Sequence, residues 1–338
     1  MNPADAPIPI ETLGRYLAAQ IGGFGALLSV RKFDGGQSNP TYLLTTKSGR
    51  YVLRCKPAGT LLKSAHAIDR EYRVLEALAS SEVPVPKARH FCADANVIGT
   101  VFYVMDFVDG RVFWDPQLPE VDAETRRRIY DEMNRVLVAL HRVDFTTRGL
   151  LEFGRQGGYF DRQIRRWTEQ YRATETVARP DVERLIEWLP AHQPADDGRV
   201  SLVHGDFRLD NMLFDGSGRV VAVLDWELST LGHPCADLAY QCAQWRLPTG
   251  PMRGLKGIDR SALNIPTEAA YVARYCQRME LTEIRNWEFC LVLSLFRLAS
   301  ICQGVYRRGM DGNASNATAL EFGERTRVIA AAAFEILA

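Results

Sequence analysis

A polar loop between two short apolar runs, followed by a hairpin that ends in an acidic residue, is the feature that most constrains the fold of this chain. The loop, residues 204–211, reads His-Gly-Asp-Phe-Arg-Leu-Asp-Asn, and Asp225 follows fourteen residues after Asn211. The apolar runs on either side have the length of buried strands, and residues 215–218, Asp-Gly-Ser-Gly, have the composition of a tight turn. The pattern therefore predicts a hairpin that carries both Asn211 and Asp225.

These residue types in this spacing are typical of phosphoryl-transfer sites. An Asp separated by four residues from an Asn, with a second Asp beyond a short hairpin, is the spacing that kinases use for the base and the metal ligands. We expect Asp206 to accept the proton of a substrate hydroxyl, and Asn211 and Asp225 to hold Mg²⁺ through their oxygen atoms. The alternative is that Asp206 and Asn211 only organise a turn, as most loop Asp and Asn residues do. The preceding His-Gly and the placement of Asp225 argue against that alternative.

The His-Gly-Asp loop resembles that of the aminoglycoside phosphotransferase and choline kinase-like family, which has His-Gly-Asp where protein kinases have His-Arg-Asp. Residues 232–239, Gly-His-Pro-Cys-Ala-Asp-Leu-Ala, are similar to the family's segment in which a helix begins near a Pro. The resemblance implies an α+β, protein-kinase-like fold of two lobes, with a small antiparallel sheet in the N-lobe and a larger, mainly helical C-lobe. It also implies ATP and Mg²⁺ as cofactors and a small-molecule hydroxyl as the acceptor. Asp237 is expected to brace the loop by hydrogen bonds and to do no chemistry.

The length of the chain agrees with two lobes, because 338 residues exceed one typical core. We expect residues 1–108 to form the nucleotide-binding lobe and residues 109–338 to form the catalytic and substrate-binding lobe. Apart from the catalytic hairpins, the second lobe is expected to be helical, with helices at residues 123–141, 159–171, 182–189, 267–279, 282–307 and 317–337.

The cation that contacts the phosphates is expected on a strand at residues 51–56. The family usually has Lys there, but here the candidates are Arg54 and Lys56, which lie two residues apart and so on one face of the strand. Arg and Lys are not interchangeable at such a site, and both charges are also compatible with a solvated strand end. The partner carboxylate is expected to be Glu71, on a helix with Ser64 as its N-cap, because its Arg-Glu context resembles that of the family.

Two further segments are candidates for nucleotide contacts. Residues 33–42 form a Gly-containing turn whose backbone N–H groups and Ser38 hydroxyl would approach the phosphates, although the segment is equally compatible with an ordinary hairpin turn. Residues 101–110 run as an apolar strand into a turn and look like the hinge between lobes. There we expect the carbonyl of Asp106 and the N–H of Val108 to bind the adenine edge. The same run is also compatible with a core strand.

Charge and cysteine content narrow the function classes. With 41 basic and 41 acidic residues, no global field favours nucleic acid or membrane binding. The seven cysteines are odd in number and contain no Cys-x-x-Cys pair, so neither a disulfide framework nor a zinc site is indicated and a reducing cytoplasm is the simplest setting. The most apolar stretch, residues 289–305, is interrupted by Arg297, so no membrane span is expected. The oligomeric state cannot be read from the sequence.

The sequence says less about the molecule that accepts the phosphoryl group than about the catalytic residues. An aminoglycoside needs an acidic pocket, and the Arg-rich second lobe does not indicate one. Nearly the whole chain looks like the phosphotransferase-like domains associated with acyl-CoA dehydrogenases, which implies a hydroxyacyl-type metabolite. A protein kinase is disfavoured, because no Asp-Phe-Gly or Ala-Pro-Glu sequence bounds an activation loop. A nucleotide-binding pseudokinase or scaffold stays open as an alternative.

Overall fold

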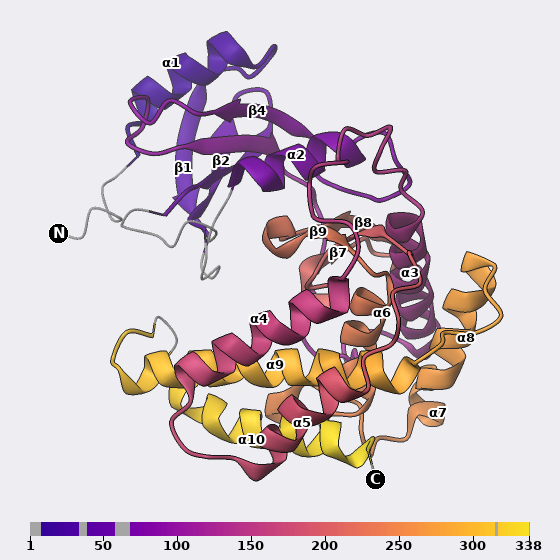
Figure 1. Ribbon diagram of the computed structural model, residues 1–338. Helices are drawn as coiled ribbons and strands as arrows, with labels where there is room; N and C mark the ends of the chain where they lie inside the picture. The colour runs from indigo at the N-terminus through magenta and orange to yellow at the C-terminus, as the bar shows by residue number, and fades with distance from the viewer. Residues whose placement is uncertain (1–7, 34–38, 58–67, 315–316, 338) are drawn as a thin grey trace.

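The chain divides into a small N-terminal lobe built on one sheet and a larger C-terminal lobe built mainly of helices (Figure 1). The computed structural model describes residues 8–33, 39–57, 68–314 and 317–337. This arrangement confirms the predicted α+β, protein-kinase-like fold. The division between residues 108 and 109 stays a prediction.

The sheet of the N-terminal lobe has the strand order β1-β2-β3-β5-β4, and all neighbouring strands are antiparallel. The strands are β1 (Leu27–Lys32), β2 (Thr41–Thr46), β3 (Arg50–Cys55), β4 (Ala88–Cys92) and β5 (Phe102–Asp106). Side chains alternate between the two faces of a strand. Leu53 of β3 is buried in a core with Leu13 and Leu17 of the helix α1 (Ile10–Gln20). Arg54 therefore points to the opposite face, toward the C-terminal lobe.

The helix α2 (Ile68–Leu78) contacts β4, β5 and the turn at Trp226–Leu228, so it lies where the two lobes meet. Its buried face includes Ile68, Leu75 and Leu78, which recur at helical spacing, and it also includes Glu71. The predicted cap, Ser64, lies outside the described residues. A buried carboxylate on this helix needs a partner at the junction of the lobes.

The C-terminal lobe is organised around one long helix, α9, which contacts α4, α5, α6 and α10 (Figure 1). The helices of this lobe are α3 (Ala123–His141), α4 (Tyr159–Thr174), α5 (Pro180–Ala191), α6 (Cys235–Cys242), α7 (Arg260–Leu263), α8 (Glu268–Met279), α9 (Trp287–Met310) and α10 (Phe322–Glu335). The prediction for α3 matches both ends. The helix predicted to begin at Thr282 begins at Trp287, because Asn286 has a φ of 55°, which an α-helix cannot accommodate.

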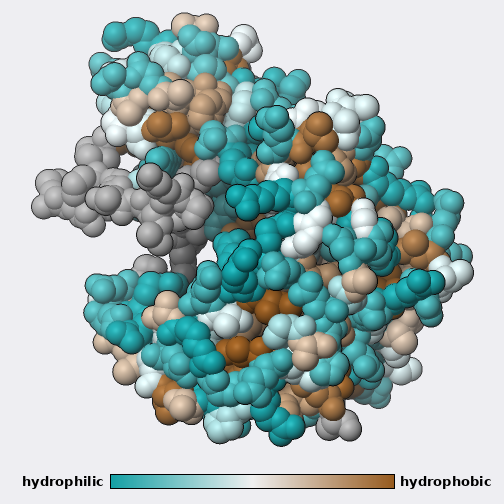
Figure 2. All heavy atoms as spheres, viewed as in Figure 1, coloured by the Kyte–Doolittle hydropathy of each residue, from teal (hydrophilic) through white to brown (hydrophobic). Residues whose placement is uncertain are grey.

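Among the described helices, α9 has the length and hydropathy of a membrane span. However, 78% of its apolar window is buried inside the protein. Packing in the helical core therefore accounts for its apolar composition. On the face seen in Figure 2, hydrophilic residues predominate and apolar residues occur in separate groups.

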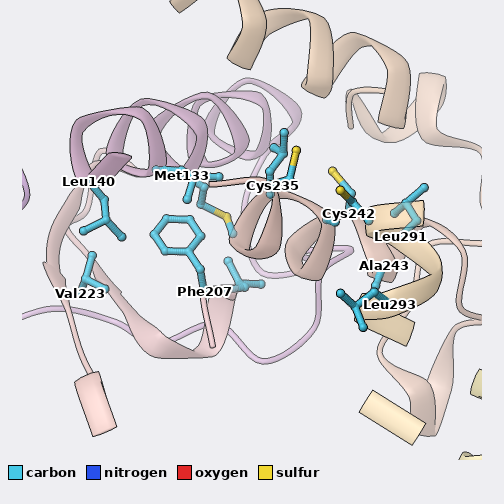
Figure 3. Close-up of a cluster of buried hydrophobic side chains, with 14 of the residues drawn as sticks. Met133, Leu140, Phe207, Val223, Cys235, Cys242, Ala243, Leu291 and Leu293 are labelled. Carbon is cyan, nitrogen blue, oxygen red and sulfur yellow. The ribbon is translucent and has the colours of Figure 1, made fainter. Parts of the chain in front are cut away.

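Two short antiparallel strand pairs, of which β7–β8 is a hairpin, carry the polar loop predicted to be catalytic. The strand β6 (Ser201–Val203) pairs with β9 (Thr230–Gly232), and β7 (Met212–Phe214) pairs with β8 (Val220–Val223). Phe207, which follows Asp206, is fully buried and faces Met133 and Leu140 of α3 (Figure 3). This anchor fixes the loop to the helical core beside the base.

Candidate active site

The backbone of the loop is held by a buried carboxylate, Asp237 of α6. Its two oxygens accept hydrogen bonds from the N–H of His204 at 2.6 Å and the N–H of Gly205 at 2.8 Å. Gly205 has a φ of 81°, and a Cβ there would lie 2.5 Å from the carbonyl oxygen of Leu228, so only glycine fits. The prediction that Asp237 braces the loop by hydrogen bonds therefore agrees with the geometry.

Asp206 stands at the end of this braced segment and is held from several sides. The amide nitrogen of Asn211 donates to Oδ2 of Asp206 at 2.9 Å and to its carbonyl oxygen at 2.9 Å. Burial acts to raise the pKa of Asp206, but Arg208, a hydrogen bond from Tyr240 and Arg297 outweigh it. The pKa of Asp206 therefore lies below its ordinary value, and the carboxylate is ionised and able to accept a proton at neutral pH.

Sequence reasoning missed two side chains that position Asp206. Arg297 of α9 donates to the carbonyl oxygen of Gly205 and lies over the ring of Tyr240, with its guanidinium carbon 4.8 Å from the centroid. Tyr240 of α6 in turn hydrogen-bonds Asp206. The only sequence signal was that Arg297 is a lone charge in an apolar run. A charged residue in a buried helix needs polar partners, which indicates a specific contact.

The two predicted metal ligands lie at one end of the β7–β8 hairpin, Asn211 directly before β7 and Asp225 two residues after β8. The N–H of Leu224 donates to the carbonyl oxygen of Asn211 at 2.8 Å, which brings Asp225 to the same end of the hairpin as Asn211. Because the amide nitrogen of Asn211 binds Asp206, its side-chain oxygen is the atom that would ligate a metal ion. One carboxylate and one amide oxygen suit Mg²⁺, which takes few protein ligands and completes its shell with phosphate and water. Among the described residues, no group of three His, Cys, Asp or Glu side chains is placed to hold a metal ion.

Arg54 joins the N-terminal lobe to this hairpin. Its Nε lies 2.9 Å from Oε2 of Glu71, and its Nη2 lies 2.7 Å from Oδ1 of Asp225. Burial acts to lower the pKa of Arg54, but Glu71, Tyr103 and Asp225 raise it, so the guanidinium keeps its charge. The predicted ion pair between the strand cation and Glu71 is present, and it is made by Arg54.

Glu71 is almost fully buried, and polar neighbours satisfy its oxygens. Asn39 donates to Oε1 at 2.7 Å, and the hydroxyl of Tyr103 donates to Oε2 at 3.0 Å. Burial raises the pKa of Glu71 to about 7, with Arg54 acting in the opposite direction. The carboxylate that orients the strand cation is therefore itself sensitive to pH near neutrality.

This pKa predicts a pH dependence of stability. Since the pKa of Glu71 is higher in the folded protein than its ordinary 4.5, its stabilising contribution is full below about pH 4.5 and is lost as the pH rises through about 7. Relative to Glu71→Gln, the free energy of unfolding of the wild type should therefore fall by up to about 3 kcal/mol across this window. Urea unfolding of both proteins at pH 5 and pH 8 measures the difference. Parallel pH profiles would contradict the assignment.

An apolar cavity of about 370 Å³ lies between the lobes and meets these charges at one end. Arg54, Asp225, Asp106 and Val108 all line it, together with apolar side chains of β3, β5 and β8. Asp106 pairs through its carboxylate with Arg89, at 2.6 Å, so a contact to adenine would use its backbone. Its size, its apolar walls and its few charged groups are those of a small-molecule or cofactor pocket.

Two predicted nucleotide contacts are not placed in this cavity. Lys56 is exposed and lies one residue past the end of β3, where its N–H donates to the carbonyl of Val101. Ser38 lies outside the described residues. The phosphate-binding roles of both residues stay predictions.

A second cavity, of about 420 Å³, lies in the C-terminal lobe and borders the polar loop. Arg208, Leu209 and Asp210 of the loop line it, as does Tyr240, the hydrogen-bond partner of Asp206. Asp206 lines neither of the two cavities, but its hydrogen-bond partner Tyr240 lines this one.

The fold and the site define a kinase-like phosphotransferase. A sequence profile of the phosphotransferase enzyme family, APH, matches residues 29–278, and the chain belongs to that family. It is 47% identical over 332 residues to acyl-CoA dehydrogenase family member 10 of Mus musculus, covering 97% of this chain and 31% of the relative. It is 43% identical to family member 11 of Rattus norvegicus, covering 91% of this chain and 40% of the relative. The chain thus spans about a third to two fifths of these curated relatives.

Solved structures agree with this assignment. A Ralstonia eutropha protein described as a candidate aminoglycoside phosphotransferase superposes with a TM-score of 0.90 at 47% identity, covering 98% of both chains. A thermostable mutant of aminoglycoside phosphotransferase APH(4)-Ia, in a ternary complex with AMP-PNP and hygromycin B, has a TM-score of 0.62 at 17% identity, covering 95% of this chain and 98% of that one. The second likeness is one of fold alone.

Proposed function

We propose that this protein is an ATP-dependent phosphotransferase that moves the γ-phosphoryl group to a hydroxyl of a small molecule. One observation carries the proposal: Asn211 hydrogen-bonds Asp206 and accepts the backbone hydrogen bond of Leu224, the residue before Asp225. Arg54 reaches Asp225 from the other lobe. Arg54, Asp225 and Leu224 line the apolar cavity, and Asn211 and Asp206 follow behind Leu224 in this chain of hydrogen bonds. We assign them as a phosphate-binding cation (Arg54), two metal ligands (Asn211, Asp225) and a base (Asp206). Kinases need these parts in this relation.

The proposed reaction follows from the positions of these side chains. Asp206 accepts the proton of the acceptor hydroxyl as its oxygen bonds to the γ-phosphorus, and ADP leaves as the bond to the β-phosphate oxygen breaks. Asn211 and Asp225 would hold Mg²⁺, which when bound would neutralise charge on the phosphates. Arg54 exchanges its contact with Asp225 for a phosphate oxygen while Glu71 keeps the guanidinium in place.

The choice between the two candidate cations gives a direct prediction. Arg54→Gln should raise the KM for ATP by about tenfold or more, because a charge-assisted hydrogen bond in a partly buried site is lost. Lys56→Gln is the matched control, since Lys56 is exposed past the end of β3, and its KM should stay near that of the wild type. Steady-state kinetics of ADP formation measures both values. A larger rise in the KM for ATP in Lys56→Gln would show that Lys56 is the phosphate-binding cation.

For the acceptor, we propose a hydroxyacyl-type metabolite rather than an aminoglycoside. The relatives that carry this domain are named as acyl-CoA dehydrogenase family members, which supports an acyl acceptor. The test is ADP formation from MgATP with a panel of hydroxylated acyl compounds and with kanamycin. If ADP formed with kanamycin and with none of the acyl compounds, this choice of acceptor would be wrong.

The contact between Arg54 and Asp225 favours one alternative, a nucleotide-binding scaffold, because it occupies a carboxylate that the metal needs. The same panel of acceptor compounds distinguishes a phosphotransferase from a scaffold. Binding of MgATP without turnover of any acceptor would favour the scaffold.

A further inference from the structure

The cavity in the helical lobe has an unusual balance of charge. Three guanidinium groups line it, those of Arg208, Arg253 and Arg325, and Asp210 is the one carboxylate among its described lining residues. Asp210 is already shared, since Arg208 binds both of its oxygens and Nη1 of Arg253 lies 3.3 Å from Oδ2. Positive charge therefore exceeds negative charge in this cavity.

Arg325 of α10 contributes a cation that its neighbours satisfy only in part. Its nearest acidic partner is Glu321, at 3.6 Å, and the Glu321 side chain is 60% exposed. Its Nε is buried without a hydrogen-bond partner, and its guanidinium carbon lies 4.2 Å from the centroid of the Phe322 ring. A buried N–H without an acceptor costs free energy unless a ligand supplies one.

The remaining walls are largely apolar. Leu247, Met252, Leu298, Phe322 and Ile329 lie among the lining residues. Only Tyr240 separates the cavity from Asp206, because Tyr240 lines it and hydrogen-bonds Asp206. A molecule bound here would contact arginines and apolar side chains and lie beside the base.

We propose that the acceptor carries an anionic oxygen group, a carboxylate or a phosphate, which Arg325 and Arg253 bind while an apolar segment packs on the cavity walls. This inference rests on the proposed function, because it assumes that the cavity beside Asp206 holds the acceptor. Arginine suits this role, since its planar fork binds both oxygens of such a group. A polycationic acceptor would face the same arginines and be repelled.

Binding of non-reactive probes tests the proposal without relying on phosphoryl transfer. Calorimetry should show that sodium decanoate and decyl phosphate bind the wild type, and that decanamide binds about tenfold or more weakly because it has no charge. The anion that binds more tightly identifies the anionic group of the acceptor as a carboxylate or a phosphate. Equal binding of decanamide, tighter binding of kanamycin, or no binding of either anion would overturn the proposal.

Variants locate the anion site. Arg325→Gln should weaken the binding of the preferred anion by about tenfold and leave decanamide unchanged, and Arg325→Lys should restore part of the loss. Arg327→Gln is the matched control, because Arg327 lies on the same helix, pairs with Glu324 and does not line the cavity. Arg253→Gln supplies a second variant if Arg325→Gln does not fold. Unchanged anion affinity in both Arg325→Gln and Arg253→Gln would overturn the proposal. A wild-type protein that binds the anion but does not bind MgATP would contradict only the proposed function.

Discussion

Replacement of Asp206 by Asn is expected to lower kcat by about two or more decades, the usual contribution of a positioned base. The Asn side chain has nearly the same shape and keeps an oxygen for the hydrogen bond from Asn211, so the loop should stay in place. It has no charge and accepts no proton from the substrate. The nucleotide cavity does not include Asp206, so affinity for MgATP should change little.

The measurement is ADP formation under saturating MgATP, with nucleotide affinity determined separately by calorimetry. Asp210→Asn is an informative comparison, because Asp210 lies on the same loop but binds Arg208 rather than the reacting hydroxyl. Its effect should fall mainly on acceptor KM. Turnover near the wild-type rate in Asp206→Asn would remove Asp206 from the role of base.

The second large effect is expected at Asp225. Asp225→Ala removes the carboxylate that we assign to Mg²⁺ and should abolish metal-dependent nucleotide binding. The rise in melting temperature that MgATP gives the wild type should then disappear, because a ligand stabilises a protein only as far as it binds the folded state.

Asp225→Asn is the companion variant, since it keeps an oxygen ligand without the charge and should retain a weak response to MgATP. Asp225→Ala removes the 2.7 Å contact with Arg54, whereas Asp225→Asn removes only the negative charge from it. Glu71 still pairs with Arg54 in both variants, so the folded structure should persist. A full thermal response to MgATP in Asp225→Ala would show that the metal ligand is elsewhere.

The catalytic hairpin could be predicted from the sequence because its information is local. Turn residues at positions 215–218 and short apolar runs on both sides define two paired strands, and the pairing brings Asn211 beside Leu224 and so near Asp225. The bracing by Asp237 also followed from a short segment with a recognisable pattern. In each case the residues lie within about thirty-five positions of one another.

The rest depended on packing between distant segments. Alternation along a strand predicts that Arg54 and Lys56 lie on one face. The strand β3 ends at Cys55, however, so Arg54 faces the cavity and Lys56 is exposed. Arg297 reaches Gly205 from 92 residues away, and no local pattern specifies that contact. The helix α1 was missed as well, although Leu13 and Leu17 have helical spacing, because its burial depends on a sheet that forms later in the chain.

The most direct test of the central claim is calorimetric titration of ATP into the wild-type protein with and without Mg²⁺. A site built from Asn211, Asp225 and Arg54 predicts binding that is at least about tenfold tighter with Mg²⁺ than without it. Absence of binding under both conditions would contradict the account and would identify a protein that keeps the kinase shape without its nucleotide.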